Sequence, residues 1–154
     1  MSQDGTGVEL EHSMGYLLKE TSSVLRAAME DALRPLGMTV THYACLELLA
    51  QRPGLSNSEL ARGAFVTRQS MNVLLRTLER DGYVTRPKEP TAGRVLPAQL
   101  TPRGRTSLEA ATAAVRAVEV TMLAALSAAE QASTFRHLQT MTQSLRDHLG
   151  SRTR

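Results

Sequence analysis

The segment TRQSMNVLLRTLER, residues 67–80, combines arginine, amide and hydroxyl side chains at spacings that suit nucleic-acid binding. Arginine can donate two hydrogen bonds to guanine, and glutamine or asparagine can pair similarly with adenine. The side chains expected to reach base edges from the first turns of a helix are Arg68, Gln69, Ser70 and Asn72. Thr67, directly before them, is also expected among the DNA-binding residues. Arg76 follows later in the helix, where it is better placed for a phosphate than for a base. This pattern predicts a helix that enters the major groove of duplex DNA.

The same segment carries an apolar stripe that determines which face of the helix stays outside. The residues that recur at helical spacing are Met71, Leu74, Leu75 and Leu78. We expect this stripe to pack against the rest of the chain, with Thr67 as the N-cap and Gly82 as the C-terminal cap. The opposite face is then polar and basic, with Val73 among its residues.

A second, shorter helix is expected just before this one, from about Asn57 to Arg62. Ser56 and Glu59 have the spacing of a capping box, and Leu55 and Leu60 occupy the positions of a hydrophobic staple around it. Gly63 follows, and its permissive backbone is expected to make the tight turn between the two helices.

A charged β-hairpin is expected after the long polar helix. Its two short strands are predicted at residues 83–86 and 94–100, with Pro97 holding the second strand at an edge, and the turn PKEPTAG between them. Arg86 is placed to bind a phosphate, and Arg94 at the hairpin tip suits the minor groove, whose negative potential attracts arginine. Thr101 and Pro102 then predict the start of a long helix.

Charge is unevenly distributed along the 154 residues. Residues 52–105 hold ten arginine or lysine residues and four acidic residues, a net charge of +6, whereas residues 1–51 have a net charge of −4 and residues 106–154 of +1. A cationic middle segment is the electrostatic pattern of a phosphate-binding surface, although a solvated basic face alone gives the same count.

Several other classes of protein fit the sequence poorly. The four histidines are scattered, no metal-binding spacing or glycine-rich phosphate loop is present, and no serine lies in a nucleophile elbow, so we expect no enzyme, no metal and no cofactor. No apolar run approaches the roughly 20 residues that cross a bilayer, and the acidic first residues do not suit a signal peptide, so a cytoplasmic protein is expected. The single cysteine, Cys45, is expected to be a buried structural thiol without a nearby cation.

The ends of the chain hold more helix than a single winged domain requires. Apolar residues recur at helical spacing from Leu18 to Leu36 and again from Leu108 to Leu149, where Ser127 and Glu130 form a second capping box. These faces either pack inside the chain or against a second copy. We favour a homodimer, which would present two recognition helices roughly 34 Å apart to a pseudo-palindromic operator.

The pieces LSNSELAR, VTRQSMNVLLRTLERDGYVTR and GRVLPAQLTPRG, within residues 55–104, resemble the multiple-antibiotic-resistance regulator (MarR) family of bacterial transcription factors in order and spacing. The resemblance extends over about residues 13–149. It implies a mainly α (α+β) fold: a winged helix-turn-helix with four helices, a β-hairpin wing and two further helices. It divides the chain into a flexible N-terminal tail at 1–12, a DNA-binding domain at 38–105, and a helical dimerisation region at 13–37 and 106–150. Ala92 departs from the family, which usually has an acidic residue there to steer the wing arginine, here Arg94.

The resemblance also implies a function, that of a ligand-responsive repressor that binds double-stranded DNA as a homodimer. Family members typically release DNA when a small aromatic or phenolic molecule binds, but no residue of this chain is assigned to such an effector. Two alternatives remain, a winged-helix module that binds protein and a small-molecule sensor without DNA binding. The first would be expected to show aromatic anchors, and only Tyr83 lies near this surface.

Overall fold

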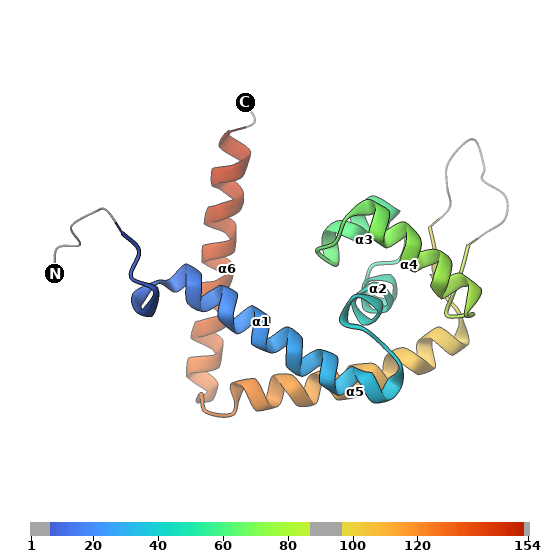
Figure 1. Ribbon diagram of the computed structural model, residues 1–154, viewed down its shortest axis with the longest axis horizontal. Coiled ribbons are helices and arrows are strands. Elements are labelled where there is room, and N and C mark those ends of the chain that lie inside the picture. Colours follow the sequence, from blue (N-terminus) through green and yellow to red (C-terminus); the bar gives the residue numbers. More distant parts are fainter. Residues whose placement is uncertain (1–6, 87–96, 153–154) are drawn as a thin grey trace. The chain divides into compact units, whose positions relative to one another are not determined.

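The computed structural model describes residues 7–86 and 97–152 (Figure 1). The elements in chain order are η1 (Leu10–His12), α1 (Met14–Leu33), η2 (Arg34–Leu36), α2 (Val40–Gln51), α3 (Asn57–Gly63), α4 (Arg68–Arg80), β1 (Val84–Thr85), β2 (Gln99–Leu100), α5 (Pro102–Leu123) and α6 (Ala128–Ser151). The predicted mainly α fold, with four helices, a two-stranded hairpin and two further helices, is confirmed. The chain forms two compact units, residues 1–118 and 119–154, which are described separately.

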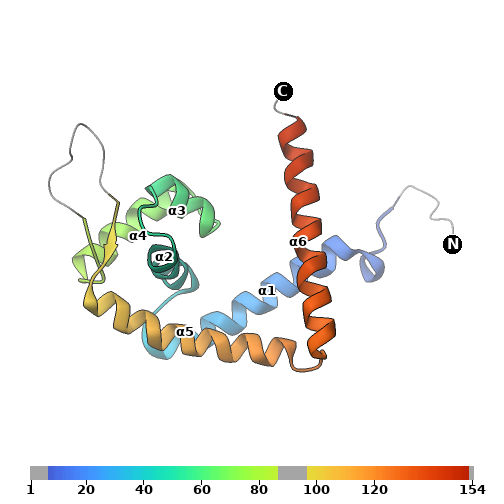
Figure 2. The same ribbon diagram turned by 180° about the vertical axis from the view of Figure 1, so that it is seen from behind.

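The first unit is organised around one hydrophobic core. Its largest fully buried side chains come from α1, α2, α3, α4 and β1: Leu33, Cys45, Leu46, Leu60, Met71, Leu75, Leu78 and Val84. Helices α2, α3 and α4 gather around this core, and both views show α3 beside α4 (Figures 1 and 2). Burying a leucine or methionine side chain contributes roughly 1.5–3 kcal/mol, so the core fixes how α4 is oriented within the unit.

The two strands pair antiparallel, with Val84 opposite Leu100 and Thr85 opposite Gln99. Val84 and Leu100 are buried, whereas Thr85 and Gln99 are exposed, as expected for a sheet with one face on the core. The described strands are shorter than predicted, and Pro97 lies outside the second one. Proline has no N–H to donate to a neighbouring strand, which accounts for a late start of β2.

The junction between the hairpin and α5 is tightly packed. The Thr101 hydroxyl donates to the carbonyl of Gly82 at 2.6 Å and accepts from the Gly104 N–H at 3.1 Å, which confirms Thr101 as the cap of α5. A Cβ at position 104 would lie 2.1 Å from the Tyr83 carbonyl oxygen. Glycine is therefore required at position 104 because the helix and the strand backbone touch there.

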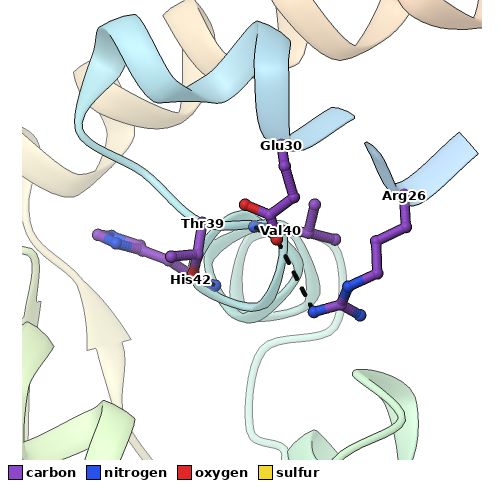
Figure 3. A network of polar contacts seen from close by, with 5 residues as sticks. All are labelled: Arg26, Glu30, Thr39, Val40 and His42. Carbon is purple, nitrogen blue, oxygen red and sulfur yellow. Dashed lines mark hydrogen bonds and ion pairs between the residues drawn. The ribbon is translucent and has the colours of Figure 1, made fainter. Parts of the chain in front are cut away.

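Helix α2 receives a second cap from α1. Thr39 accepts a hydrogen bond from the His42 N–H at 3.1 Å, and the Glu30 carboxylate accepts one from the Val40 N–H at 3.3 Å. Figure 3 shows Glu30 reaching the first turn of α2 while Arg26 pairs with it, at 3.8 Å. An anionic group at a helix N-terminus is favourable because the unpaired N–H groups there carry partial positive charge.

The second unit contains the end of α5 and all of α6. Ser127 caps α6 by accepting from the Glu130 N–H at 3.2 Å. The Gln131 side chain donates to the carbonyls of Leu123 and Leu126, at 3.2 and 3.1 Å, and so closes the turn between the two helices. None of the residues of α6, all of which the structure describes, is buried.

In the described part of the chain no single helix is both long and apolar enough to cross a membrane; α5 and α6 meet that test only when they are taken together.

Candidate nucleic-acid interface

Helix α3 begins where the sequence predicts. The Ser56 hydroxyl accepts from the Glu59 N–H at 3.2 Å, and the Glu59 carboxylate accepts from the Ser56 N–H at 2.7 Å. Hydrogen bonding of the carboxylate by the Ser56 backbone N–H, and secondly by the Ser56 side chain, favours its charged form and lowers the pKa of Glu59. The predicted capping box is confirmed, and it fixes the first turn of α3 next to α4.

The turn between α3 and α4 differs from the prediction. Phe65, not Gly63, adopts the left-handed conformation, with φ of 59°. The hydrogen bonds from Val66 N–H to Ala61 O and from Phe65 N–H to Arg62 O, at 3.0 and 3.3 Å, form the Schellman pattern that ends a helix. Gly63 instead is the last residue of α3, and a Cβ there would lie 2.9 Å from the Leu48 side chain. The glycine therefore allows the end of the Leu48 side chain of α2 to pack closely against α3, and it does not make the turn.

Helix α4 has the two faces that the sequence predicts. Met71, Leu75 and Leu78 are at most 1% exposed, and Leu74 packs partly buried against the core. The exposed residues of the helix are Arg68, Gln69, Ser70, Val73, Arg76, Glu79 and Arg80. Gly82, with φ of 81°, follows the C-cap Asp81 and ends the helix as predicted.

Two of the predicted DNA-binding side chains also hold the helix start together. The Thr67 hydroxyl accepts from the Ser70 N–H at 3.0 Å, as predicted for the N-cap, and donates to the Ser70 hydroxyl at 2.9 Å. Both residues are exposed. Their hydroxyl groups therefore have positions set by each other at the N-terminal end of α4, where unpaired N–H groups favour an anion such as phosphate.

Asn72 lies between α4 and α3. Its Oδ1 accepts a hydrogen bond from Asn57 Nδ2 at 2.7 Å, and its side chain is half-buried. The bond joins α3 and α4, the two helices of the helix-turn-helix. It uses only the oxygen of the Asn72 amide, so the two N–H groups of Asn72 Nδ2 are not used in this bond. The sequence gives no sign of this contact, because the two residues are fifteen positions apart and belong to different helices.

Arg86 is less exposed than the arginines of α4. Its side chain is 23% exposed, and its Nε lies 3.8 Å from the Glu79 carboxylate. Nε and Nη2 are buried without a hydrogen-bond partner among the described residues. A phosphate bound to Arg86 would have to reach the remaining Nη1. Arg94, the predicted minor-groove arginine, lies outside the described residues, as do Lys88 and Ala92.

Two further arginines near the interface contact groups of the chain itself. Arg80 is exposed and pairs with Asp81 at 3.3 Å. The Arg103 guanidinium lies 4.8 Å from the centroid of the Tyr83 ring, a cation–π contact, and the same ring meets His42 edge to face at 5.2 Å. Tyr83, a half-buried residue, is therefore covered on two sides.

Cys45 is buried, as predicted, and the charge of one arginine acts on its thiol. Burial raises the pKa of the Cys45 thiol to about 12, and the positive charge of Arg86 opposes that rise. Arg86 is 41 positions away in sequence, so inspection of the sequence neighbours of Cys45 does not reveal this electrostatic effect. The burial effect is the larger one, so the thiol stays protonated and poorly nucleophilic.

Two other places in the described chain could in principle hold a ligand, a metal cluster and a surface hollow. Among the described residues, no three histidine, cysteine, aspartate or glutamate side chains lie close enough to hold a metal ion. An open hollow between α2 and α5 is lined by Glu47, Leu108, Glu109, Thr112, Ala113 and Arg116. Two carboxylates beside one guanidinium give it no preference for an anion.

Comparisons with known proteins agree on one family. The MarR family model matches residues 36–95. The HTH-type transcriptional repressor Rv2887 of Mycobacterium tuberculosis is 48% identical over 125 residues, which cover 81% of this chain and 90% of the relative. A crystal structure of Rv2887 with DNA has a TM-score of 0.70 at 46% identity and covers 84% of this chain and 97% of that one. A structure of Rv2887 with salicylic acid has a TM-score of 0.71 at 47% identity and covers 84% and 96%.

Proposed function

The chain belongs to the MarR family, and we propose that it is a repressor that binds a pseudo-palindromic DNA operator as a homodimer and releases it when a small aromatic molecule binds. The relatives that support this proposal are transcriptional repressors, and one of them has been crystallised both with DNA and with salicylic acid. An operator-binding protein works where the chromosome lies, so the proposal places this one in the cytoplasm. It assigns the chain no catalytic activity.

The observation that carries the proposal is the outer face of α4. Arg68, Gln69 and Arg76 are exposed on a helix whose other face is fixed in the core, so their cationic and amide groups have no role in packing. A rigid helix with such a face can enter the major groove and bind base edges and phosphates together. A module that binds protein would be expected to carry a cluster of aromatic anchors instead. Tyr83 is covered by His42 and Arg103, but Phe65, in the turn before α4, is 94% exposed, so the expectation that only Tyr83 lies near this surface is wrong; Phe65 is a single ring beside a face of cationic and amide groups.

We assign roles along this face. Arg68, Gln69 and the free donors of Asn72 contact base edges, while Thr67 and Ser70 sit at the helix start beside a phosphate. Arg76 binds a phosphate from the exposed face, and Arg86 does so only through the end of its guanidinium. Arg94 remains the proposed minor-groove contact of the wing.

The terminal helices are proposed to make the dimer. The proposal keeps residues 13–37 and 106–150 as the dimerisation region, residues 38–105 as the DNA-binding domain and residues 1–12 as a tail. Phe135 and Leu145 of α6 are 63% and 64% exposed, and Val24 of α1 is 63% exposed. Large apolar side chains that are exposed together on one helix face are rarely left in water by a stable protein. A twofold partner would cover them.

A ligand acts in this proposal by changing the relative stability of DNA-binding and non-binding arrangements of the dimer. A coupling free energy of about 1–3 kcal/mol between the two sites is enough to switch a promoter. We propose an aromatic acid as the class of effector, by analogy with the relative crystallised with salicylic and p-aminosalicylic acids. The charge of the hollow between α2 and α5 does not favour it as the effector site.

The test is selection of bound sequences from random duplex DNA by the full chain. We expect an enriched pair of inverted half-sites with centres about one helical turn apart. Affinity for the enriched sequence should fall steeply with salt, with a log–log slope near −7 for about eight phosphate contacts per dimer. No enrichment, or an affinity that does not change with salt, would exclude the proposal and favour the protein-binding or sensor alternatives.

A further inference from the structure

Val73 is an apolar side chain on the otherwise polar outer face of α4. It is 57% exposed. Its neighbours one turn before and after it on the helix surface are Gln69, Ser70, Arg76 and Thr77. The Thr77 hydroxyl donates back to the Val73 carbonyl at 3.2 Å, so that hydroxyl is turned toward the helix backbone. The valine methyl groups are therefore presented to the outside within a ring of hydrogen-bonding side chains.

Neither packing nor helix formation accounts for a valine at this position. More than half of its surface is open, and the residues of α4 that pack in or against the core are Met71, Leu74, Leu75 and Leu78. A β-branched side chain also lowers helix propensity relative to alanine, leucine or arginine. A single exposed valine is common on protein surfaces. This one lies between Gln69 and Arg76 on the face proposed to meet DNA. An apolar side chain at that place would contact the edges of the bases, so its lack of donors and acceptors affects which base it can face.

The major groove offers one apolar group on the edge of a base, the 5-methyl of thymine. Val73 follows Gln69 by one turn, about 6 Å along the helix axis, so a helix that brings Gln69 to a base edge carries Val73 along the same groove. Val73 has no donor or acceptor for the polar atoms of any base, thymine O4 included, so the thymine methyl is the one group on a base edge that it can contact favourably. Thymine is thus the base that suits Val73.

We propose that Val73 recognises a thymine in each half of the operator by packing against its 5-methyl group, an inference that rests on the proposed DNA-binding function. This contact makes Val73 a specificity-determining residue beside the hydrogen-bonding residues of α4. Burial of one methyl group corresponds to about fourfold in affinity for each half-site and about fifteenfold for the two together.

The experiment removes that methyl group and nothing else. Each thymine of the enriched operator is replaced in turn by deoxyuridine, symmetrically in both half-sites, and the affinity of the full chain is measured by fluorescence anisotropy. The wild-type protein is expected to lose about fifteenfold in affinity at one position and little at the others. The same series is then measured with Val73→Ser, because serine and valine have similar helix propensity.

In Val73→Ser the loss caused by deoxyuridine at that position should shrink to about twofold or less, while the effects at other positions stay as in the wild type. Val8→Ser, at another exposed valine (75% exposed), is the matched control and should reproduce the wild-type series. A wild-type protein indifferent to every thymine methyl would overturn the inference, as would a Val73→Ser series identical to that of the wild type. If no duplex is enriched at all, the proposed function itself has failed, a result distinct from both.

Discussion

Helices α4 and α6 are both amphipathic and both begin at a capping hydroxyl, but their apolar faces differ in what covers them. In α4, which has 13 residues, Met71, Leu75 and Leu78 are buried in the core of the same chain. In α6, which has 24 residues, the described part of the chain buries none, and Phe135 and Leu145 are more than 60% exposed. The same helical pattern therefore has two different uses.

The difference assigns a kind of partner to each helix. Once the apolar side of α4 is buried, what it offers is its polar and cationic side, which suits the phosphates and base edges of a nucleic acid. Helix α6 offers the reverse, an apolar side that suits another protein surface. These two assignments can be tested by adding charge to the apolar side of α6, or by removing charge from the polar side of α4, while the other helix is left unchanged.

The largest effect is expected from charging the apolar side of α6. Leu138→Asp combined with Leu145→Asp would place two carboxylates in the proposed dimer interface, where an unpaired buried charge is costly. We expect a monomer by analytical ultracentrifugation. Operator affinity should fall more than 100-fold, because the second half-site would no longer be bound at high effective concentration.

The matched control places the same charges elsewhere on α6. Thr140 and Ser144 are exposed, and their hydroxyl groups donate to backbone carbonyls of their own helix. Thr140→Asp combined with Ser144→Asp should leave the dimer intact and operator affinity within about threefold. Circular dichroism should show that both double variants keep their helices. A fully dimeric Leu138→Asp, Leu145→Asp variant would show that α6 does not use its apolar side as inferred.

The next effect concerns the polar side of α4. Arg68→Ala removes an exposed side chain in the first turn and is expected to lower operator affinity by about 10–100-fold and to relax the preference at one base pair of each half-site. Arg80→Ala is the control, because Arg80 is in the last turn and already pairs with Asp81 at 3.3 Å. Its loss should stay below about threefold. Equal losses, measured by anisotropy on the same duplex, would mean that α4 contributes charge and no base recognition.

Features that depend on a few consecutive residues could be predicted from the sequence. The helix starts at Ser56, Thr67 and Ser127 and the end at Gly82 were found because a cap involves side chains and backbone groups within three or four positions. The two faces of α4 were found for a similar reason, since periodicity is a local property. The family resemblance supplied the order of the elements and the wing.

Features that depend on distant segments meeting in space could not be predicted. The Asn57–Asn72 hydrogen bond, the electrostatic effect of Arg86 on the Cys45 thiol and the contact that requires glycine at position 104 each involve different elements. The permissive backbone of glycine predicts that Gly63 makes the turn between α3 and α4. Contact with Leu48 explains why the glycine stands there, and the left-handed φ falls to Phe65.

A smaller effect is expected from the strained residue that precedes α4. Among the described residues Phe65 is the one non-glycine residue with positive φ, and its side chain is 94% exposed. Phe65→Gly should raise the free energy of unfolding by about 0.5–1 kcal/mol, because glycine adopts this conformation without steric cost and little packing is lost. Ala64→Gly, at the neighbouring position with φ of −92°, is the control and should lower stability instead. Urea unfolding of both variants measures the difference, and a destabilised Phe65→Gly would mean that the exposed ring makes a contact worth more than the strain.

The smallest effect is a pH dependence of stability that is expected from His42, near the core that supports α4, and not from a histidine of α6. Burial lowers the pKa of His42, an effect that the negative charge of Asp81 partly opposes. The folded chain therefore resists protonation at pH values where the unfolded chain, with an ordinary histidine pKa near 6.5, binds the proton. The stability that depends on neutral His42 is fully present above that value and is lost as the pH falls from there through the lower pKa of the folded state.

In urea unfolding at pH 7.5 and 5.5, His42→Gln should reduce the loss of stability on acidification, whereas His137→Gln, on exposed α6, should leave that loss as in the wild type. A wild-type loss retained in full by His42→Gln would assign the acid sensitivity to another group.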